Sequence, residues 1–174
     1  MSGARVLVLG DFFLDRYVEC HTLGISPEQP VPRLRETQVH EIAGASGNLA
    51  ANFASLGAQV SAVGIVGADE AGIRLSSSLE ASGIDTNLLL VDPQTDTVCI
   101  TRYLTSKSDE EHHYLRVDSG ATRAPAPETI ERLRHGISHE LEAASALFIA
   151  DYDEFDGFGL VTRELLENVL EPAR

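Results

Sequence analysis

Aspartates that directly follow apolar runs are the residues of this sequence best placed to do chemistry. Asp11 and Asp15 follow the run at 5–9, and Asp151 follows the run at 146–150. A carboxylate can accept hydrogen bonds from two neighbouring hydroxyl groups, which suits it to binding a polyol such as a sugar. Because the carboxyl ends of parallel strands meet at one rim of a sheet, we expect these aspartates to lie near one another.

The segment from Ala43 to Gly67, AGASGNLAANFASLGAQVSAVGIVG, is the most informative stretch of the chain. It joins a loop of small residues to an Ala/Asn-rich helix and then to an apolar strand that ends in glycine. Such a loop lets a polar ligand approach the backbone, and the first amides of the helix favour an anion or the oxygen-rich face of a sugar. Asn48 adds a side-chain donor and acceptor there. A tightly packed helix start gives the same pattern, so the spacing alone leaves both interpretations open.

Strands and helices alternate along most of the chain. We expect core strands at 5–9, 60–66, 88–91 and 146–150, and helices at 48–56, 70–82, 125–143 and 160–170. This alternation is typical of an α/β fold with a doubly wound, mostly parallel sheet. We therefore predict that residues 1–174 belong to a single domain.

Strand-only segments interrupt the alternation twice. The first is a predicted strand at 31–42, which follows a proline-rich stretch at 25–32 that we expect to be extended chain at a sheet edge. The second is a pair of strands, 98–105 and 114–117, around a polar turn. We expect these segments, about 16–42 and 97–118, to form a small β-lid beside the main sheet.

Composition limits the kinds of binding partner and the cellular compartment that we expect for this chain. The net charge of −14 argues against nucleic acid or an anionic membrane as a partner. No apolar run approaches the roughly 20 residues that span a bilayer, and the N-terminus shows no signal peptide. Cys20 and Cys99 lack metal or redox spacing, so we expect a reducing, cytoplasmic setting.

Two familiar kinds of ligand site do not fit the sequence. The single lysine, Lys107, does not follow a glycine, which excludes a Walker-type phosphate loop and leaves arginines or backbone amides for any phosphate. An acidic run, 151–157, has the wrong spacing for a calcium loop, and the adjacent His112 and His113 would point to opposite faces of a strand. We therefore expect no metal site.

Several motifs together resemble the PfkB/ribokinase family of carbohydrate kinases. They are GDFFLDRY at 10–17, ISPEQPVP at 25–32 and the segment from Ala43 to Gly67, in that order. Within this family the chain is most similar to the N-terminal part of the heptose-7-phosphate kinases, which form the kinase domain of a bifunctional protein of ADP-heptose synthesis. TRYL at 101–104, LRVD at 115–118 and ADY at 150–152 also fit that pattern.

The resemblance implies a ribokinase-like core with a β-lid that closes over a sugar. It assigns the substrate-binding roles to residues on the first strand end, the small-residue loop and the lid: Asp15, Gly44, Ala45, Asn48, Arg116 and Asp118. Asp11 is expected to be a structural acid at the strand end, and Asp118 could serve only as an ion-pair partner of Arg116. The complete enzyme would transfer phosphate from ATP, with Mg²⁺, to a hydroxyl of a sugar, with heptose 7-phosphate favoured. The exposed strand at 31–42 could pair with a second copy to form a homodimer.

The sequence departs from the family pattern in three places. Ser46 stands where Gly or Ala is usual, and the run 151–157 is acidic where heptose kinases tend to have a basic residue. The Gly-Ala-Gly-Asp element that supplies the anion hole and the catalytic base is absent from the sequence. We therefore expect no catalytic residue, no tight ATP or Mg²⁺ binding and no kinase activity from this chain alone. A kinase for another sugar or a nucleoside, and a non-catalytic sugar-binding or assembly module, stay as alternatives.

Overall fold

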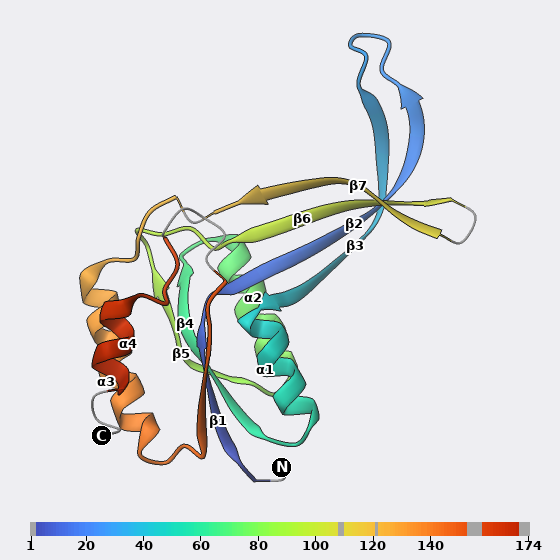
Figure 1. Ribbon diagram of the computed structural model, residues 1–174. Coiled ribbons are helices and arrows are strands. Elements are labelled where there is room, and N and C mark those ends of the chain that lie inside the picture. Colours follow the sequence, from blue (N-terminus) through green and yellow to red (C-terminus); the bar gives the residue numbers. More distant parts are fainter. Residues whose placement is uncertain (1–2, 108–109, 121, 153–157, 171–174) are drawn as a thin grey trace.

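A parallel four-stranded sheet with helices on both faces forms the core (Figure 1). The computed structural model describes residues 3–107, 110–120, 122–152 and 158–170. The strand order is β5-β4-β1-β8, with β1 (Arg5–Gly10), β4 (Gln59–Gly67), β5 (Asp85–Asp92) and β8 (Ala146–Ala150). The helices are α1 (Ser46–Ser55), α2 (Glu70–Ala81), α3 (Pro127–Leu141) and α4 (Arg163–Leu170). The predicted doubly wound α/β fold is confirmed.

Alternation along β1 explains why helices cover both faces of this sheet. Val6 and Val8 point to the face that α1 and α2 cover, where they join one buried apolar cluster. Leu7 and Leu9 point to the opposite face and pack in a second cluster with α3 and α4. Since a strand with apolar residues at every position can bury both of its faces, β1 lies in the interior of the sheet.

A second sheet projects from the core and forms the lid (Figure 1). Its strand order is β3-β2-β6-β7, with β2 (Phe12–Ile25), β3 (Pro32–Ala45), β6 (Cys99–Lys107) and β7 (Glu110–Ser119). Strands β2 and β3 form a long antiparallel hairpin, β6 runs parallel to β2, and β7 returns antiparallel to β6. The predicted β-lid is confirmed.

The structure corrects three boundaries. The prediction missed β2, a strand separated from β1 only by Asp11, because charged residues interrupt its apolar pattern. The segment 25–32, expected to be extended, mostly turns: the Ser26 N–H donates to the Val31 carbonyl at 2.8 Å, and the prolines fill the tip of the hairpin. Helix α4 begins later than predicted because the Leu160 N–H is bonded to the Asp11 carboxylate instead of beginning a helix.

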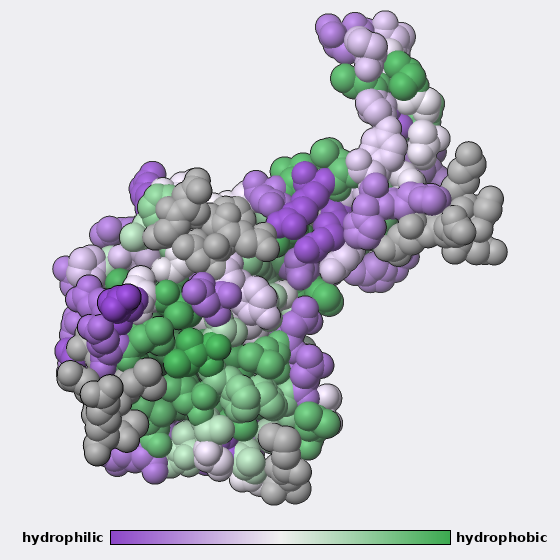
Figure 2. Space-filling model, viewed as in Figure 1, coloured by the Kyte–Doolittle hydropathy of each residue, from purple (hydrophilic) through white to green (hydrophobic). Residues whose placement is uncertain are grey.

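Strand β8 forms an apolar edge of the core. In the described part of the chain β1 is its only strand partner, and Phe148 and Ile149 are each 37% exposed. Figure 2 shows hydrophobic residues gathered over this part of the core, whereas the projecting lid is mostly hydrophilic in the same view. A parallel sheet usually has both of its faces covered, and an apolar edge strand is usually protected. The exposed apolar side chains of β8 are therefore typical of a strand in the interior of a sheet. None of the helices described is long and apolar enough to cross a membrane.

Candidate functional site

Asp15 is a nearly buried carboxylate on the inner face of the lid. It lies on β2, is 7% exposed, and its Oδ1 accepts a hydrogen bond from Arg102 Nη1 at 2.5 Å. Gly44 on β3 lies directly against the other carboxylate oxygen, where a Cβ atom would overlap Oδ2. Glycine is therefore the residue that leaves room for this carboxylate. The contact brings together the motif at 10–17, which contains Asp15, and the small-residue loop, which contains Gly44.

Arg102 holds this carboxylate from the neighbouring strand. Its position on β6 pairs with Tyr17 on β2, and its guanidinium lies 5.2 Å from the centre of the Tyr17 ring, in a cation–π arrangement. The Arg102 side chain is 20% exposed. An ionised carboxylate has about four acceptor positions, so the pair with Arg102 leaves Asp15 able to accept further hydrogen bonds from a ligand.

Arg116 and Asp118 extend the same face of the lid. In the register of the sheet, Asp118 pairs with Ile100, which pairs with Asp15, so these three side chains form one row. Arg116 pairs with Arg102 in the next row, and its Nε donates to Asp118 Oδ1 at 2.7 Å. The structure thus brings three of the predicted residues to one face, and it shows the Arg116–Asp118 ion pair that the sequence left as an alternative role.

The small-residue loop carries an unusual backbone conformation. Ala45, which directly precedes α1, has φ 49° and ψ −121°, a conformation that L residues rarely adopt. Ser46 is fully buried: its N–H donates to the Asp11 carbonyl at 3.0 Å, and its Oγ lies 3.5 Å from the Ala150 carbonyl. Ser46, which departs from the family pattern, therefore links the ends of β1 and β8. Asn48 is exposed on the first turn of α1.

Replacing Ala45 with glycine is expected to stabilise the chain. Relief of a strained non-glycine conformation is worth about 1–3 kcal/mol, and the extra flexibility of glycine in the unfolded chain takes back about 0.5–1 kcal/mol. We expect the free energy of unfolding of Ala45→Gly to rise by about 1 kcal/mol in urea denaturation. Ala51→Gly, inside α1, is the matched control and should lower it by about 1 kcal/mol. Equal destabilisation by both would contradict the strain at position 45.

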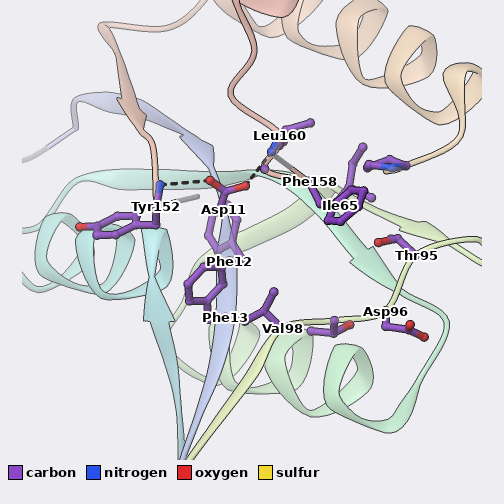
Figure 3. A pocket seen from close by; sticks show the side chains of 13 residues that line it. Asp11, Phe12, Phe13, Ile65, Thr95, Asp96, Val98, Tyr152, Phe158 and Leu160 are labelled. Atoms are coloured by element: carbon purple, nitrogen blue, oxygen red, sulfur yellow. Dashed lines mark hydrogen bonds between the residues drawn. The ribbon is translucent and has the colours of Figure 1, made fainter. Parts of the chain in front are cut away.

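A cleft lies next to this face, at the carboxyl rim of the parallel sheet (Figure 3). Phe13, on the same face of β2 as Asp15, contributes to it, together with a rim of residues that includes Asp11, Ile65, Thr95, Asp96, Val98, Tyr152 and Phe158. Figure 3 shows the Asp11 carboxylate accepting hydrogen bonds from the N–H groups of Tyr152, at 3.1 Å, and Leu160, at 2.8 Å. These bonds fit the structural role expected for Asp11.

Side-chain hydrogen bonds fix the loop that forms one wall of this cleft. Asp69, the N-cap of α2, accepts from the Gly72 N–H and, through its other oxygen, from the Thr97 N–H, both at 2.7 Å. The Thr97 hydroxyl accepts from the Gly67 N–H at 2.8 Å. The end of β4, the start of α2 and the loop before β6 are therefore tied together.

No three His, Cys, Asp or Glu side chains converge on a possible metal position within the described residues. The acidic run predicted to matter for a sugar phosphate lies mainly at 153–157, outside the described residues; Asp151 is exposed. The sequence did not single out Arg102 because its contact with Asp15 spans 87 positions. Its place in the TRYL motif at 101–104 was the only sequence feature that pointed to Arg102.

A doubly wound sheet with a projecting β-lid is the architecture of a ribokinase-like protein. Residues 4–152 match the family model described as pfkB family carbohydrate kinase, and the chain belongs to this family.

Curated relatives agree with this assignment. The chain is 33% identical to the bifunctional protein HldE of Granulibacter bethesdensis, over 99% of this chain and 34% of that protein. It is 36% identical to the D-beta-D-heptose 7-phosphate kinase of Bordetella bronchiseptica, over 87% of this chain and 46% of that protein. The chain therefore spans a third to a half of the length of these relatives.

Solved structures share the fold. Phosphofructokinase-2 from Escherichia coli, in complex with fructose-6-phosphate, superimposes with a TM-score of 0.66 and 22% identity, over 99% of this chain and 52% of that chain. Ribokinase from Arabidopsis thaliana, complexed with ribose and ATP, has a TM-score of 0.55 and 20% identity, over 86% of this chain and 45% of that chain.

Proposed function

We propose that this chain is the sugar-binding part of an ATP-dependent carbohydrate kinase, with heptose 7-phosphate as the favoured substrate. The observation that carries the proposal is the Asp15 carboxylate, nearly buried against Gly44 on the inner face of the lid. The names of the curated relatives, among them a D-beta-D-heptose 7-phosphate kinase, support this choice of sugar.

The proposed site binds hydroxyl groups through its carboxylates. Asp15 would accept hydrogen bonds from two adjacent sugar hydroxyls while Arg102 balances its charge. Gly44 and Ala45 would let the sugar ring approach the backbone, and Asn48, Arg116 and Asp118 would contact its periphery. A site built on such bonds rejects sugars that lack the matching hydroxyls, because its buried polar groups would then have no partner.

ATP and Mg²⁺ are the cofactors we propose for the complete enzyme. Bound together, they supply the transferred phosphoryl group and the positive charge that stabilises its transfer. The described residues show no cluster of carboxylates that could hold Mg²⁺, and the sequence lacks the Gly-Ala-Gly-Asp element. These residues therefore do not fit the cofactor, and we derive no step of phosphoryl transfer from them.

Calorimetric titration of the chain with a panel of ligands tests the proposal. The panel is heptose 7-phosphate, fructose 6-phosphate, ribose and adenosine. We expect saturable binding that is tightest for heptose 7-phosphate. Tightest binding of ribose or adenosine would favour the second candidate, a kinase for another sugar or a nucleoside. The acidic sequence after Tyr152 favours that candidate because it offers no cation for a phosphate. Binding of none of the four would refute a sugar site.

We also propose that two copies of the chain pair through the free edge of β3. This strand is an edge of the lid sheet, and Val39 on it is 40% exposed. Unpaired backbone groups of an edge strand favour pairing with another strand.

The lid dimer predicts a doubled mass in sedimentation equilibrium at tens of micromolar protein. Val39→Lys should shift the chain to monomer because it places a charge at the contact. Val117→Lys, on the opposite edge strand β7, where Val117 is 46% exposed, is the matched control and should stay dimeric. A monomeric unmodified chain, or dissociation only by Val117→Lys, would contradict pairing through β3.

A further inference from the structure

Four charged side chains join the outer face of the lid to α2. Arg16 on β2 and Glu41 on β3 are paired in the register of the hairpin, and their side chains lie 3.4 Å apart. Arg74 on α2 donates through Nη1 to Glu41 at 2.8 Å and through Nη2 to Glu70 at 2.5 Å. We call these four residues the lid clamp.

The lid clamp surrounds a small apolar floor. Leu14 on β2, Ala71 on α2 and Cys99 on β6 line the same cavity as the four charged residues. Leu14 is buried and Cys99 is half-buried. The root of the lid therefore rests on α2 through apolar contacts, and the ion pairs lie at the edge of that contact.

The clamp lies directly behind the candidate sugar site. Successive side chains of a strand point to opposite faces, so Arg16 faces the clamp and its neighbour Asp15 faces the inner side. Glu41 likewise lies next to Ile42, whose register partner is Asp15. Any tilt of the β2–β3 root relative to α2 moves both faces together, because a paired hairpin tilts as one body.

We propose that Arg74 is a positioning residue that sets the tilt of the lid root, and through it the place of Asp15 against the core. Glu70 and Arg74 both lie on α2, but only Arg74 contacts β3. Its guanidinium pairs with Glu41 on β3 and with Glu70 on its own helix. The guanidinium fork suits this role because it can bond two carboxylates at once, which an ammonium group does with less fixed geometry. The hydrogen bonds to Glu70 and then to Glu41 raise the pKa of Arg74, so its charge persists at any working pH. The sugar-related part of this inference rests on the proposed function.

Cys99 gives a direct measure of the clamp without any sugar. Burial raises the pKa of its thiol, and the thiol lies under the ion pairs, so it should react slowly with a bulky disulfide reagent. We expect Arg74→Met to speed labelling of Cys99 about three- to fivefold, the size expected for losing a small network of exposed ion pairs. Raising the salt concentration should speed labelling in the unmodified chain and leave Arg74→Met unchanged. Cys20→Ser in every sample restricts the reaction to Cys99.

Arg134→Met is the matched control. Arg134 also pairs with a glutamate on its own helix, Glu131, at 2.6 Å, but it lies on α3, which does not cover the face of the sheet under the lid. We expect its labelling rate to equal that of the unmodified chain. Equal rates for Arg74→Met and Arg134→Met would overturn the clamp.

Sugar affinity separates a positioning role from a merely structural one. Arg74→Met should weaken binding of heptose 7-phosphate about three- to fivefold and lower the thermal midpoint by no more than about 3 °C, and Arg74→Lys should restore part of the affinity. Unchanged affinity in Arg74→Met would overturn the coupling to Asp15. If neither the variants nor the unmodified chain binds a sugar, the proposed function fails. The labelling rates of Cys99 still decide whether the lid clamp holds the lid.

Discussion

Asp15→Ala is expected to weaken sugar binding by about 10- to 100-fold. Hydrogen bonds to a charged group contribute about 1.5–3 kcal/mol each, which corresponds to that range of affinity. The substitution also leaves Arg102, only 20% exposed, without the carboxylate that it holds at 2.5 Å. The measurement is calorimetric titration with the sugar that binds the unmodified chain most tightly.

Two further variants make the Asp15 prediction decisive. Asp85→Ala removes an exposed carboxylate at the start of β5, far from the lid, and should leave sugar affinity unchanged. Gly44→Ala keeps the Asp15 carboxylate but places a methyl group where Oδ2 lies, so it should also weaken binding at least tenfold. Circular dichroism establishes that each variant is folded. Asp15→Ala with the affinity of Asp85→Ala would show that the carboxylate does not contact the sugar.

The residues that form the Asp15 site differ in how far the sequence could reveal them. Asp15 and Gly44 were predicted from short motifs, and the structure places them against each other because their strands are hydrogen-bonded neighbours. That they bind a sugar stays a prediction. Arg102 was missed as the partner of Asp15, because a contact between two strands depends on sheet order, and no local pattern encodes that order.

The same distinction applies to the fold. Long apolar and periodic segments, such as β4 and α2, were predicted almost to their ends because local burial decides them. Strand β2 was missed because it belongs to the lid sheet, where charged side chains such as Asp15, Arg16 and Glu19 interrupt its apolar pattern. The conformation of Ala45 could not be predicted, since alanine there is opposed by its own backbone preference and is held only by the surrounding structure.

Asp92→Ala is expected to lower the free energy of unfolding by about 3 kcal/mol, and with it the thermal midpoint by about 10 °C. Asp92 ends β5 and is fully buried, and its carboxylate accepts from the Gln94 N–H at 2.7 Å and the Ala126 N–H at 2.6 Å. The Thr129 side chain also favours the charged form of this carboxylate. Removing the carboxylate leaves buried donors without partners, at the point where α3 begins beside the candidate cleft.

The contribution of Asp92 to the free energy of unfolding should decrease as the pH falls. Burial alone would raise the pKa of Asp92, but the hydrogen bonds from Gln94, Ala126 and Thr129 outweigh it and hold the pKa below its ordinary value of 3.8. The folded state thus binds this proton less readily than the unfolded state. The stabilisation is complete above the unfolded pKa of about 4 and is lost as pH falls through the lower pKa of the folded chain.

Urea denaturation of the unmodified chain and of Asp92→Asn across pH 3–7 measures this dependence. We expect a constant difference in unfolding free energy from about pH 5 upward and a shrinking difference below about pH 4. Asp85→Asn, at the exposed opposite end of the same strand, is the matched control and should differ little from the unmodified chain at any pH. A difference for Asp92→Asn that stayed constant down to pH 3 would mean that the charge of Asp92 does not hold the start of α3.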